Sequence, residues 1–297
     1  MLSADCMRCL VNRQLRMLDE YDDEENKARY MCEVFGILSN MEKGAAAPVA
    51  VRKMDALFKE YFGKIRSFDD VKTKYNALLL SMEDSLMERV RQSDDPLLCA
   101  LKFSRIGNYI DFGALADVNE KQLYELTDSA PDDYLDPVEY EHFKADISKA
   151  SKMVFITDNC GEIVFDKLLI RTIVEMFPAL SLTVMVRGLP VLNDATREDA
   201  LLVGIDKYAP IADNGCSIAG TYMPEISKEA KDLILSADLI IAKGQGNFET
   251  MFGCGLNVYY AFLCKCVWFE KRFGMKRLEG IFTNERRQKF NVSGSAL

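Results

Sequence analysis

Apolar residues in the first half of the chain recur every three or four positions. Segments 28–38, 51–61 and 71–90 each carry such a stripe, which is typical of helices that bury one face. The acidic pair before Pro96 indicates the start of another helix, because proline is tolerated in a first helical turn. No pattern typical of a strand occurs before Asp111, so this half is expected to be helical.

The pattern changes after the acidic, proline-bearing segment 128–136, which is expected to be a connection. From there, short apolar runs rich in β-branched residues alternate with helical patterns, which predicts a parallel sheet with helices on both faces. The expected strands are 153–157, 182–186, 205–211 and 239–242, with further candidates at 258–263 and 280–283, and the expected helices are 163–177, 195–203 and 227–236.

The length of the chain, 297 residues, favours two domains, and a hydrophobic content of 49% is enough for a sizeable core. The change of pattern predicts a helical domain at 1–149 and an α/β domain at 150–297. In open parallel sheets, ligands bind beyond the carboxyl ends of the strands, near the point where the strand order reverses. The residues directly after each expected strand are therefore the first candidates for a functional site.

The charge of the chain disfavours several classes of partner. The 46 acidic and 37 basic residues give a formal net charge of −9, and no basic stripe stands out. Nucleic acids and anionic membranes bind clustered Lys and Arg, so neither is an expected partner. The start MLSADCMRC lacks the cationic and apolar regions of a signal peptide, and no apolar run is long enough to span a bilayer. We expect a cytoplasmic protein with reduced thiols, whose oligomeric state the sequence leaves open.

Few residue types are available for a metal site. The chain has a single histidine, His142, in a polar setting typical of a surface residue, so a site built on several histidines is excluded. Cys6 and Cys9 supply half of a structural zinc site, but the other half is not visible, and packing is the favoured interpretation. Any other metal has to be bound mainly by oxygen atoms.

The first expected strand runs directly into a group of polar residues. Asp158 and Asn159 follow it, and Glu162 opens the next helix. These residues suit a helix cap, since acidic groups favour a helix N-terminus. They equally suit a site for Mg²⁺ or Mn²⁺, to which Asp194, after the second strand, would add a carboxylate. Asp194 taken alone is more typical of a cap, and both interpretations stay open on these residues.

Lys243 comes directly off another apolar strand, in IAKGQGNFE. Two glycines around Gln245 let the backbone approach a ligand, with amides free to bind phosphate oxygens at the start of a helix. A lysine here offers a point charge to phosphate, although lysines at strand ends are usually solvated. The segment is not a Walker loop, because the lysine precedes the glycines.

Four ordered segments resemble one known family. TDNCGEIVFD, RGLPVLNDAT, ADLIIAKGQGNFE and FLCKC are similar to motifs of the damage-control phosphatase family, long called domain of unknown function 89, and look like its prokaryotic subfamily I. SRIGNYIDFG and the amino-terminal Cys-x-x-Cys pair are also similar to that subfamily, so the resemblance covers nearly the whole chain. It implies metal-dependent hydrolysis of phosphomonoesters on a Rossmann-like α/β domain with an added helical domain.

The resemblance also implies roles for individual residues. The metal ligands would be Asp158, Asn159 and Asp194, which with Lys243 are the expected catalytic residues. Glu162 would line the substrate pocket, and Lys243, Gly244, Gln245, Gly246 and Asn247 would hold the phosphate. Lys265 resembles a further lysine of the family, and Asn108 and Asp111 are candidate cleft residues from the helical domain.

The expected substrates are small phosphorylated metabolites, either sugar phosphates or damaged, cofactor-related phosphomonoesters, and the expected metal is Mg²⁺, Mn²⁺, Co²⁺ or Ni²⁺. Attack by Asp158 and attack by a water molecule are both open. A haloacid-dehalogenase-type phosphatase is disfavoured, because Cys160 stands where that pattern has a second Asp. Two alternatives remain, namely methyl transfer from S-adenosylmethionine, for which DNCGE offers only one glycine, and a metabolite-binding protein without turnover.

Overall fold

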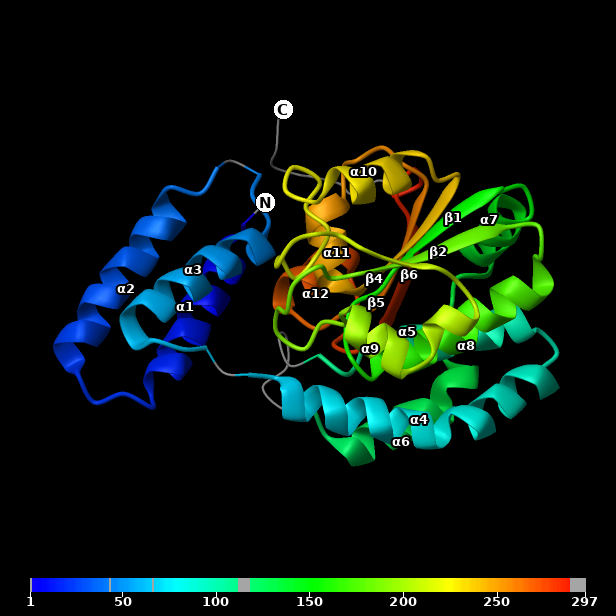
Figure 1. Cartoon of the computed structure of the whole chain (residues 1–297), viewed down its shortest axis with the longest axis horizontal. Coiled ribbons are helices and arrows are strands. Elements are labelled where there is room, and N and C mark those ends of the chain that lie inside the picture. The colour runs from blue at the N-terminus through cyan, green and yellow to red at the C-terminus, as the bar shows by residue number, and fades with distance from the viewer. Residues whose placement is uncertain (1, 43, 66, 112–117, 289–297) are drawn as a thin grey trace.

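The computed structural model describes residues 2–42, 44–65, 67–111 and 118–288 (Figure 1). The described residues before Asp111 form helices and no strand, which confirms the prediction for this half. Helices α1 to α3 stand beside the rest of the molecule, whereas α5 and α7 lie against the sheet and α4 and α6 pack outside them. The helices of this half are α1 (Ala4–Leu18), α2 (Glu24–Ser39), α3 (Ala47–Phe62), α4 (Asp69–Gln92), α5 (Pro96–Gly107), α6 (Glu120–Ser129) and α7 (Pro137–Ile147).

The helical half contributes to two hydrophobic clusters. Helices α1 to α3 pack around one of their own, in which Tyr30, Val34 and Met54 have no exposed surface. Helices α4 to α7 share a second cluster with one face of the sheet, where Phe103 of α5 stacks on Phe165 of the helix that follows β1. The division into domains at residue 149 stays a prediction. The shared cluster brings α4 and α5 close to the ends of the strands.

Six strands form one sheet in the order β3-β2-β1-β4-β5-β6, in which β1 to β5 are parallel and β6 is antiparallel at the edge. In the centre, Phe155 of β1 lies opposite Val184 of β2 and Ile241 of β4. The strand order reverses between β1 and β4, which is where sheets of this kind bind ligands. The strands are β1 (Lys152–Ile156), β2 (Ser181–Val186), β3 (Ile211–Asp213), β4 (Leu239–Lys243), β5 (Val258–Leu263) and β6 (Gly280–Asn284).

Helices cover both faces of the sheet. Phe155 of β1 joins the cluster beneath α4, α5 and α8, whereas its neighbour Ile156 joins another cluster beneath α10, α11 and α12. Strands buried on both faces read as continuous apolar runs, which is why the sequence reveals them. The predicted α/β fold is confirmed. The helices of this half are α8 (Glu162–Met176), α9 (Arg197–Leu202), α10 (Lys228–Leu235), α11 (Gly244–Met251) and α12 (Val267–Phe273).

The third expected strand, at 205–211, is wrong. Ile205–Lys207 forms a 3₁₀ turn, and β3 spans only Ile211–Asp213. Gly204, with a φ of 78°, reverses the chain after α9, and the turn follows at once. Ile205 is apolar because it is buried beneath this turn, not because it pairs with another strand. The other expected strands and helices of this half are present, with ends shifted by at most two residues.

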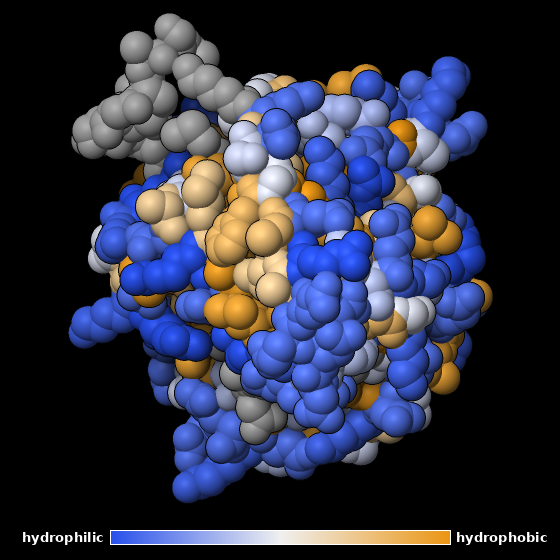
Figure 2. Space-filling model, turned by 90° about the vertical axis from the view of Figure 1, so that its left-hand side faces the viewer, coloured by the Kyte–Doolittle hydropathy of each residue, from blue (hydrophilic) through white to orange (hydrophobic). Residues whose placement is uncertain are grey.

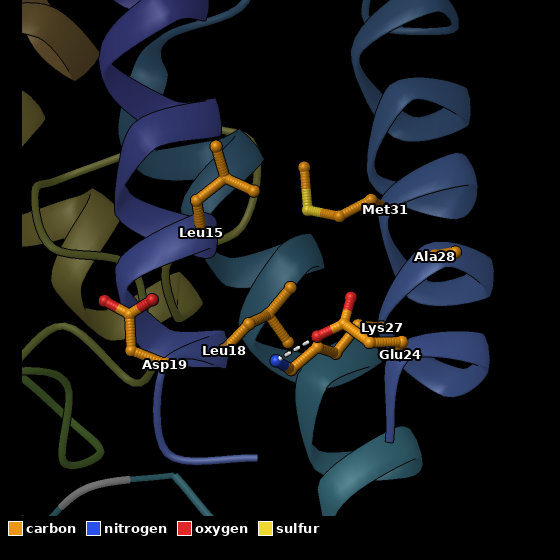
Figure 3. A pocket seen from close by; sticks show the side chains of 7 residues that line it. All are labelled: Leu15, Leu18, Asp19, Glu24, Lys27, Ala28 and Met31. Carbon is orange, nitrogen blue, oxygen red and sulfur yellow. Dashed lines mark hydrogen bonds and ion pairs between the residues drawn. The ribbon is translucent and has the colours of Figure 1, made fainter. Parts of the chain in front are cut away.

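The outer side of the α1–α3 bundle carries apolar side chains among hydrophilic ones (Figure 2). Met7 and Leu15 of α1 and Phe35 of α2 are exposed. A hollow of about 260 Å³ lies between α1 and α2, and none of the residues at the strand ends lines it (Figure 3). No helix in the described ranges is long and apolar enough to cross a membrane. The hollow is lined by Leu15, Leu18, Asp19, Glu24, Lys27, Ala28 and Met31.

Candidate active site

The connections that leave β1 and β2 lie side by side at the carboxyl edge of the sheet. Asn159 pairs with Asp194 in an isolated β-bridge. The Ala195 N–H donates a hydrogen bond to the Asp158 carbonyl oxygen at 2.7 Å. These backbone contacts bring together the three metal ligands that the resemblance implies.

Glu162 lies in the first turn of α8 as expected, but neither Asn159 nor Asp194 is the N-cap of the helix that follows it. The N-cap of α8 is Gly161, which has no side chain to donate or accept a hydrogen bond. The Asn159 amide instead donates to two carboxylates, those of Asp158 and Glu162. Helix α9 is capped by Thr196, not by Asp194. The side chains of Asn159 and Asp194 are therefore not used to begin a helix.

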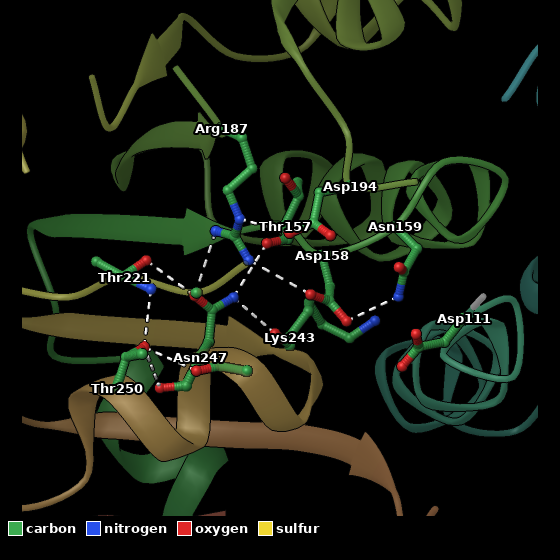
Figure 4. A network of polar contacts seen from close by, with 12 residues as sticks. Asp111, Thr157, Asp158, Asn159, Arg187, Asp194, Thr221, Lys243, Asn247 and Thr250 are labelled. Carbon is green, nitrogen blue, oxygen red and sulfur yellow. Dashed lines mark hydrogen bonds and ion pairs between the residues drawn. The ribbon is translucent and has the colours of Figure 1, made fainter. Parts of the chain in front are cut away.

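Arg187, which is not among the predicted site residues, joins the carboxylates of Asp158 and Asp194 (Figure 4). Its guanidinium is 1% exposed and donates to Asp158 Oδ1 at 3.3 Å, to Asp194 Oδ2 at 2.7 Å and to Asn247 Oδ1 at 3.3 Å. The signal in the sequence was its place, since it is the first residue after the apolar strand β2. The Arg187 guanidinium therefore keeps the carboxylates of Asp158 and Asp194 close together.

Replacing Arg187 by methionine is expected to lower the free energy of unfolding of the metal-free protein by about 3–5 kcal/mol, because it leaves buried charges without a partner. Urea denaturation in the presence of a chelator measures this. Arg197→Met is the matched control, since Arg197 pairs with Asp213 at the surface and its loss is expected to cost about 1 kcal/mol or less. Equal losses in the two variants would contradict the assignment of Arg187.

Lys243 is fully buried and makes three polar contacts. Its ammonium donates to Glu162 Oε1 at 2.7 Å, to Asp166 Oδ1 at 2.6 Å and to the Ser104 carbonyl oxygen at 2.7 Å. Burial by itself lowers the pKa of Lys243, but the two carboxylates outweigh it and raise the pKa above its ordinary value. Asp166 was also missed, although it lies one helical turn after Glu162 and so on the same face of α8. Direct contact of Lys243 with phosphate stays a prediction. A phosphate oxygen would then replace one of the three acceptors that the Lys243 ammonium binds here.

The helical half reaches the site through the end of α5. Asn108 donates to Asp158 Oδ2 and to Glu162 at 3.1 Å, and it is fully buried. Lys265, which follows β5, donates to Asp111 Oδ2 and to the Asn108 carbonyl oxygen, both at 2.6 Å. The structure thus groups the two candidate cleft residues, Asn108 and Asp111, with Lys265. The last two residues of SRIGNYIDFG lie outside the described residues.

In the turn between β4 and α11, the backbone lies very close to a neighbouring segment of the chain. A Cβ atom on Gly246 would lie 2.2 Å from the Ala219 carbonyl oxygen, so only glycine fits. Gln245 accepts a hydrogen bond from the Lys265 N–H at 2.8 Å. All four hydrogen-bonding positions of the Asn247 side chain are used within the protein, so phosphate binding there would fall to its backbone N–H. The partners of Asn247 are Thr157 O, Lys243 O, Arg187 Nη1 and Thr221 Oγ1 (Figure 4).

The charges of this region do not balance. Five carboxyl groups, here called the acidic cluster, are paired with three cations, which leaves two negative charges without compensation when all are ionised. A divalent cation is the simplest group that offsets them. The acidic cluster is Asp111, Asp158, Glu162, Asp166 and Asp194, and the cations are Arg187, Lys243 and Lys265.

The residues present fit a hard divalent ion. Asp158, Asp194 and Asn159 supply carboxylate and amide oxygens, the ligands that Mg²⁺ and Mn²⁺ prefer. In the part of the chain that the structure describes, no three His, Cys, Asp or Glu side chains are grouped for a metal, so the amide of Asn159 is essential to this set. Among the described residues, Cys6 and Cys9 are not grouped with a third His, Cys, Asp or Glu for a metal, and their role stays open.

Burial shifts the titration of the acidic cluster. It raises the pKa of Asp158 well above its ordinary value, with further contributions from the charges of Asp194 and Glu162. Burial also raises the pKa of Asp194 to about 6, although Arg187 opposes the shift. Asp166 behaves alike, with a pKa of about 7 despite its contact with Lys243.

The metal-free protein is therefore expected to become less stable as pH rises. Asp158, Asp166 and Asp194 keep protons in the folded state that the unfolded chain releases near pH 3.8, so the free energy of unfolding falls between about pH 4 and pH 7. Urea denaturation across this range in the presence of a chelator measures the fall. Saturating Mn²⁺ should reduce it, leaving the parts due to Asp166, which is not a proposed metal ligand, and to Glu249, whose pKa burial against α3 raises to about 7. Stability that rises over this range would contradict the prediction.

Sequence comparisons place the chain among known proteins. Residues 2–279 match the family described as the damage-control phosphatase ARMT1-like domain. An uncharacterized protein of Methanocaldococcus jannaschii is 30% identical over 288 residues, with 89% of each chain covered. A damage-control phosphatase of Archaeoglobus fulgidus is 30% identical over 274 residues, which cover 89% of this chain and 92% of that one.

A solved structure agrees with these matches. The crystal structure of a protein of the domain-of-unknown-function-89 family from Pyrococcus horikoshii has the same fold, with a TM-score of 0.80 and 24% identity. The superposition covers 95% of this chain and 98% of the other. The family match spans nearly the whole chain, as the resemblance of the four motifs led us to expect. The chain belongs to the damage-control phosphatase family.

Proposed function

We propose that the protein is a metal-dependent phosphatase that hydrolyses small phosphorylated metabolites at the carboxyl ends of β1, β2 and β4. The observation that carries this proposal is the excess of carboxyl groups over cations in the acidic cluster beside the first turn of α11. A divalent cation held by Asp158, Asn159 and Asp194 would offset that charge and neutralise the phosphate of the substrate. The family of the chain supports the same reaction.

The first turn of α11 is the place we assign to the phosphate. The N–H groups at the start of a helix have no partner within it, and they favour anions. Gly244 and Gly246 keep side chains away from this turn, so a ligand can approach the backbone. Lys243, directly before it, would exchange its contact with Glu162 for one with a phosphate oxygen, while Asp166 holds the ammonium in place.

Asp158 is oriented for one of two roles. Its carboxylate accepts hydrogen bonds from Asn108, Asn159 and Arg187, which fix both oxygens. It either attacks phosphorus and forms an acyl phosphate, or it orients the attacking water. Acid quenching of a single turnover with a labelled phosphoryl group leaves the label on the protein in the first case and not in the second.

The burial of the site favours a small substrate. Asp158, the most exposed of the proposed metal ligands, is only 6% exposed, and Gln245 in the phosphate turn is 7% exposed. A phosphate group on the surface of a folded protein would not reach residues this buried. A small molecule, such as a sugar phosphate or a damaged, cofactor-related phosphomonoester, is the kind of substrate we assign to the site.

A panel of small phosphomonoesters tests the proposal. The protein is treated with a chelator, and phosphate release is then measured after adding Mg²⁺, Mn²⁺, Co²⁺ or Ni²⁺, for wild type and for Asp194→Ala. We expect turnover that returns with metal in wild type and is absent from the variant. Tight binding of a phosphomonoester without release at any metal would instead support a metabolite-binding protein.

A further inference from the structure

Asn76 of α4 is a buried polar residue that the reaction described above does not use. It is 1% exposed, and both ends of its amide are bound. Its Oδ1 accepts a hydrogen bond from the Gly161 N–H at 2.6 Å, and its Nδ2 donates to Asp199 Oδ1 at 2.9 Å. A single side chain from the helical half thus contacts two segments that are far apart in the sequence.

Those two segments are the connections that carry the proposed metal ligands. Gly161 lies two residues after Asn159, in the turn that leaves β1. Asp199 accepts hydrogen bonds from the N–H and the hydroxyl of Thr196, at 2.8 and 2.9 Å, and Thr196 lies two residues after Asp194. Asn76 therefore connects the turn of Asp158 and Asn159 to the turn of Asp194.

The contact with Gly161 is tightly constrained. Gly161 has a φ of 68°, and a Cβ atom there would lie 2.9 Å from the Ile110 side chain and 3.0 Å from Tyr75 Cβ. The turn is therefore pressed against α4, where the Gly161 N–H is out of reach of solvent and depends on Asn76 for a partner. At the second turn, Lys72, one helical turn before Asn76 on α4, forms an ion pair with Asp199 at 2.5 Å. Helix α4 therefore contacts both turns through side chains.

We propose that Asn76 is a positioning residue for the metal site, which sets the distance between the turn that carries Asp158 and Asn159 and the turn that carries Asp194. The inference rests on the proposed function, because it requires that these residues bind an ion. Residues that orient metal ligands from behind typically change metal affinity when they are replaced. A residue that only stabilises the fold would not do so.

The test is the affinity for Mn²⁺, measured by titration calorimetry on the folded, metal-free protein. In Asn76→Asp a second carboxylate faces Asp199, so the turns are pushed apart, and we expect the dissociation constant to rise at least about tenfold. The double variant Asn76→Asp/Asp199→Asn exchanges amide and carboxylate, so the pair can form again and most of the affinity should return. Asn76→Ser, which is too short to reach both partners, gives the same comparison should Asn76→Asp not fold.

Tyr75→Phe is the matched control. It removes a buried hydrogen bond, from the Tyr75 hydroxyl to the Val118 carbonyl oxygen, at the neighbouring position of α4 and keeps Cβ against Gly161. We expect Mn²⁺ affinity within about twofold of wild type. If folded Asn76 variants bind Mn²⁺ as tightly as Tyr75→Phe does, the positioning role of Asn76 is overturned, but the metal site is not. Wild type that binds no Mn²⁺ would overturn the metal site itself, and with it this inference.

Discussion

Replacing Asp158 by asparagine is expected to reduce phosphate release by on the order of a thousandfold or more, because the change removes both a metal ligand and the group that attacks or orients the nucleophile. The asparagine side chain has nearly the same shape, so the fold should persist. Its one oxygen can accept from Arg187 or from Asn108 but not from both, because these two donate to different oxygens of Asp158. Phosphate release at saturating Mn²⁺, measured beside thermal unfolding of the same samples, separates chemistry from stability.

The stability of this variant has an expected sign. Burial raises the pKa of Asp158 well above its ordinary value, so its ionised form is unfavourable in the metal-free protein. At pH 8, Asp158→Asn without metal is expected to unfold at the same temperature as wild type or a higher one. Asp213→Asn, at the end of β3 and half exposed, is the matched control and should keep its activity. Full activity in Asp158→Asn would remove Asp158 from the mechanism.

Replacing Gly244 by alanine is expected to reduce turnover by at least about a hundredfold, because it displaces the Asp158 carboxylate. The added Cβ would lie 1.9 Å from Asp158 Oδ2 and 2.2 Å from its carboxyl carbon. Gly244 also has a φ of 81°, which alanine rarely adopts, so the variant should be less stable as well. Steady-state kinetics and urea denaturation measure the two effects.

Gly255→Ala separates the clash from the backbone strain. Gly255 has a φ of 75°, and nothing lies within 4 Å of a Cβ atom placed there. In both variants the free energy of unfolding should fall by about 1–2 kcal/mol, because alanine is strained at a positive φ. Only Gly244→Ala should also lose activity. Equal activity losses would mean that Gly244 acts through stability and not through its contact with Asp158.

The sequence predicts those parts of the structure that depend on residues close together in the chain. Helix α4 and strand β5 follow from periodicity and from β-branched or aromatic runs, and the order of strands and helices implies which strand ends meet. The expected strand at 205–211 failed because a buried 3₁₀ turn needs the same apolar residues as a strand. Gly204 and the burial of Ile205 against the sheet favour the 3₁₀ turn over a strand, and a run of apolar residues in the sequence does not distinguish the two.

The same limit applies to the site. Asp158 and Asn159 were found because they closely follow the first strand, and Asp194 because it lies in the connection after the second. Asn76 acts through contacts across 85 and 123 positions of sequence, and nothing in its neighbourhood marks it. Arg187 directly follows β2, but its contact with Asp158, 29 positions away, is visible only in the structure. The unbalanced charge of the acidic cluster, which carries the proposed function, also arises only when residues of α5, α8 and three strand ends come together.

Anomalous scattering from a crystal of the protein with Mn²⁺ and inorganic phosphate tests the central claim most directly. We predict one strong peak between the side-chain oxygens of Asp158, Asn159 and Asp194, with phosphate beside it at the first turn of α11. A peak at other residues only, or phosphate bound away from this edge of the sheet, would contradict it.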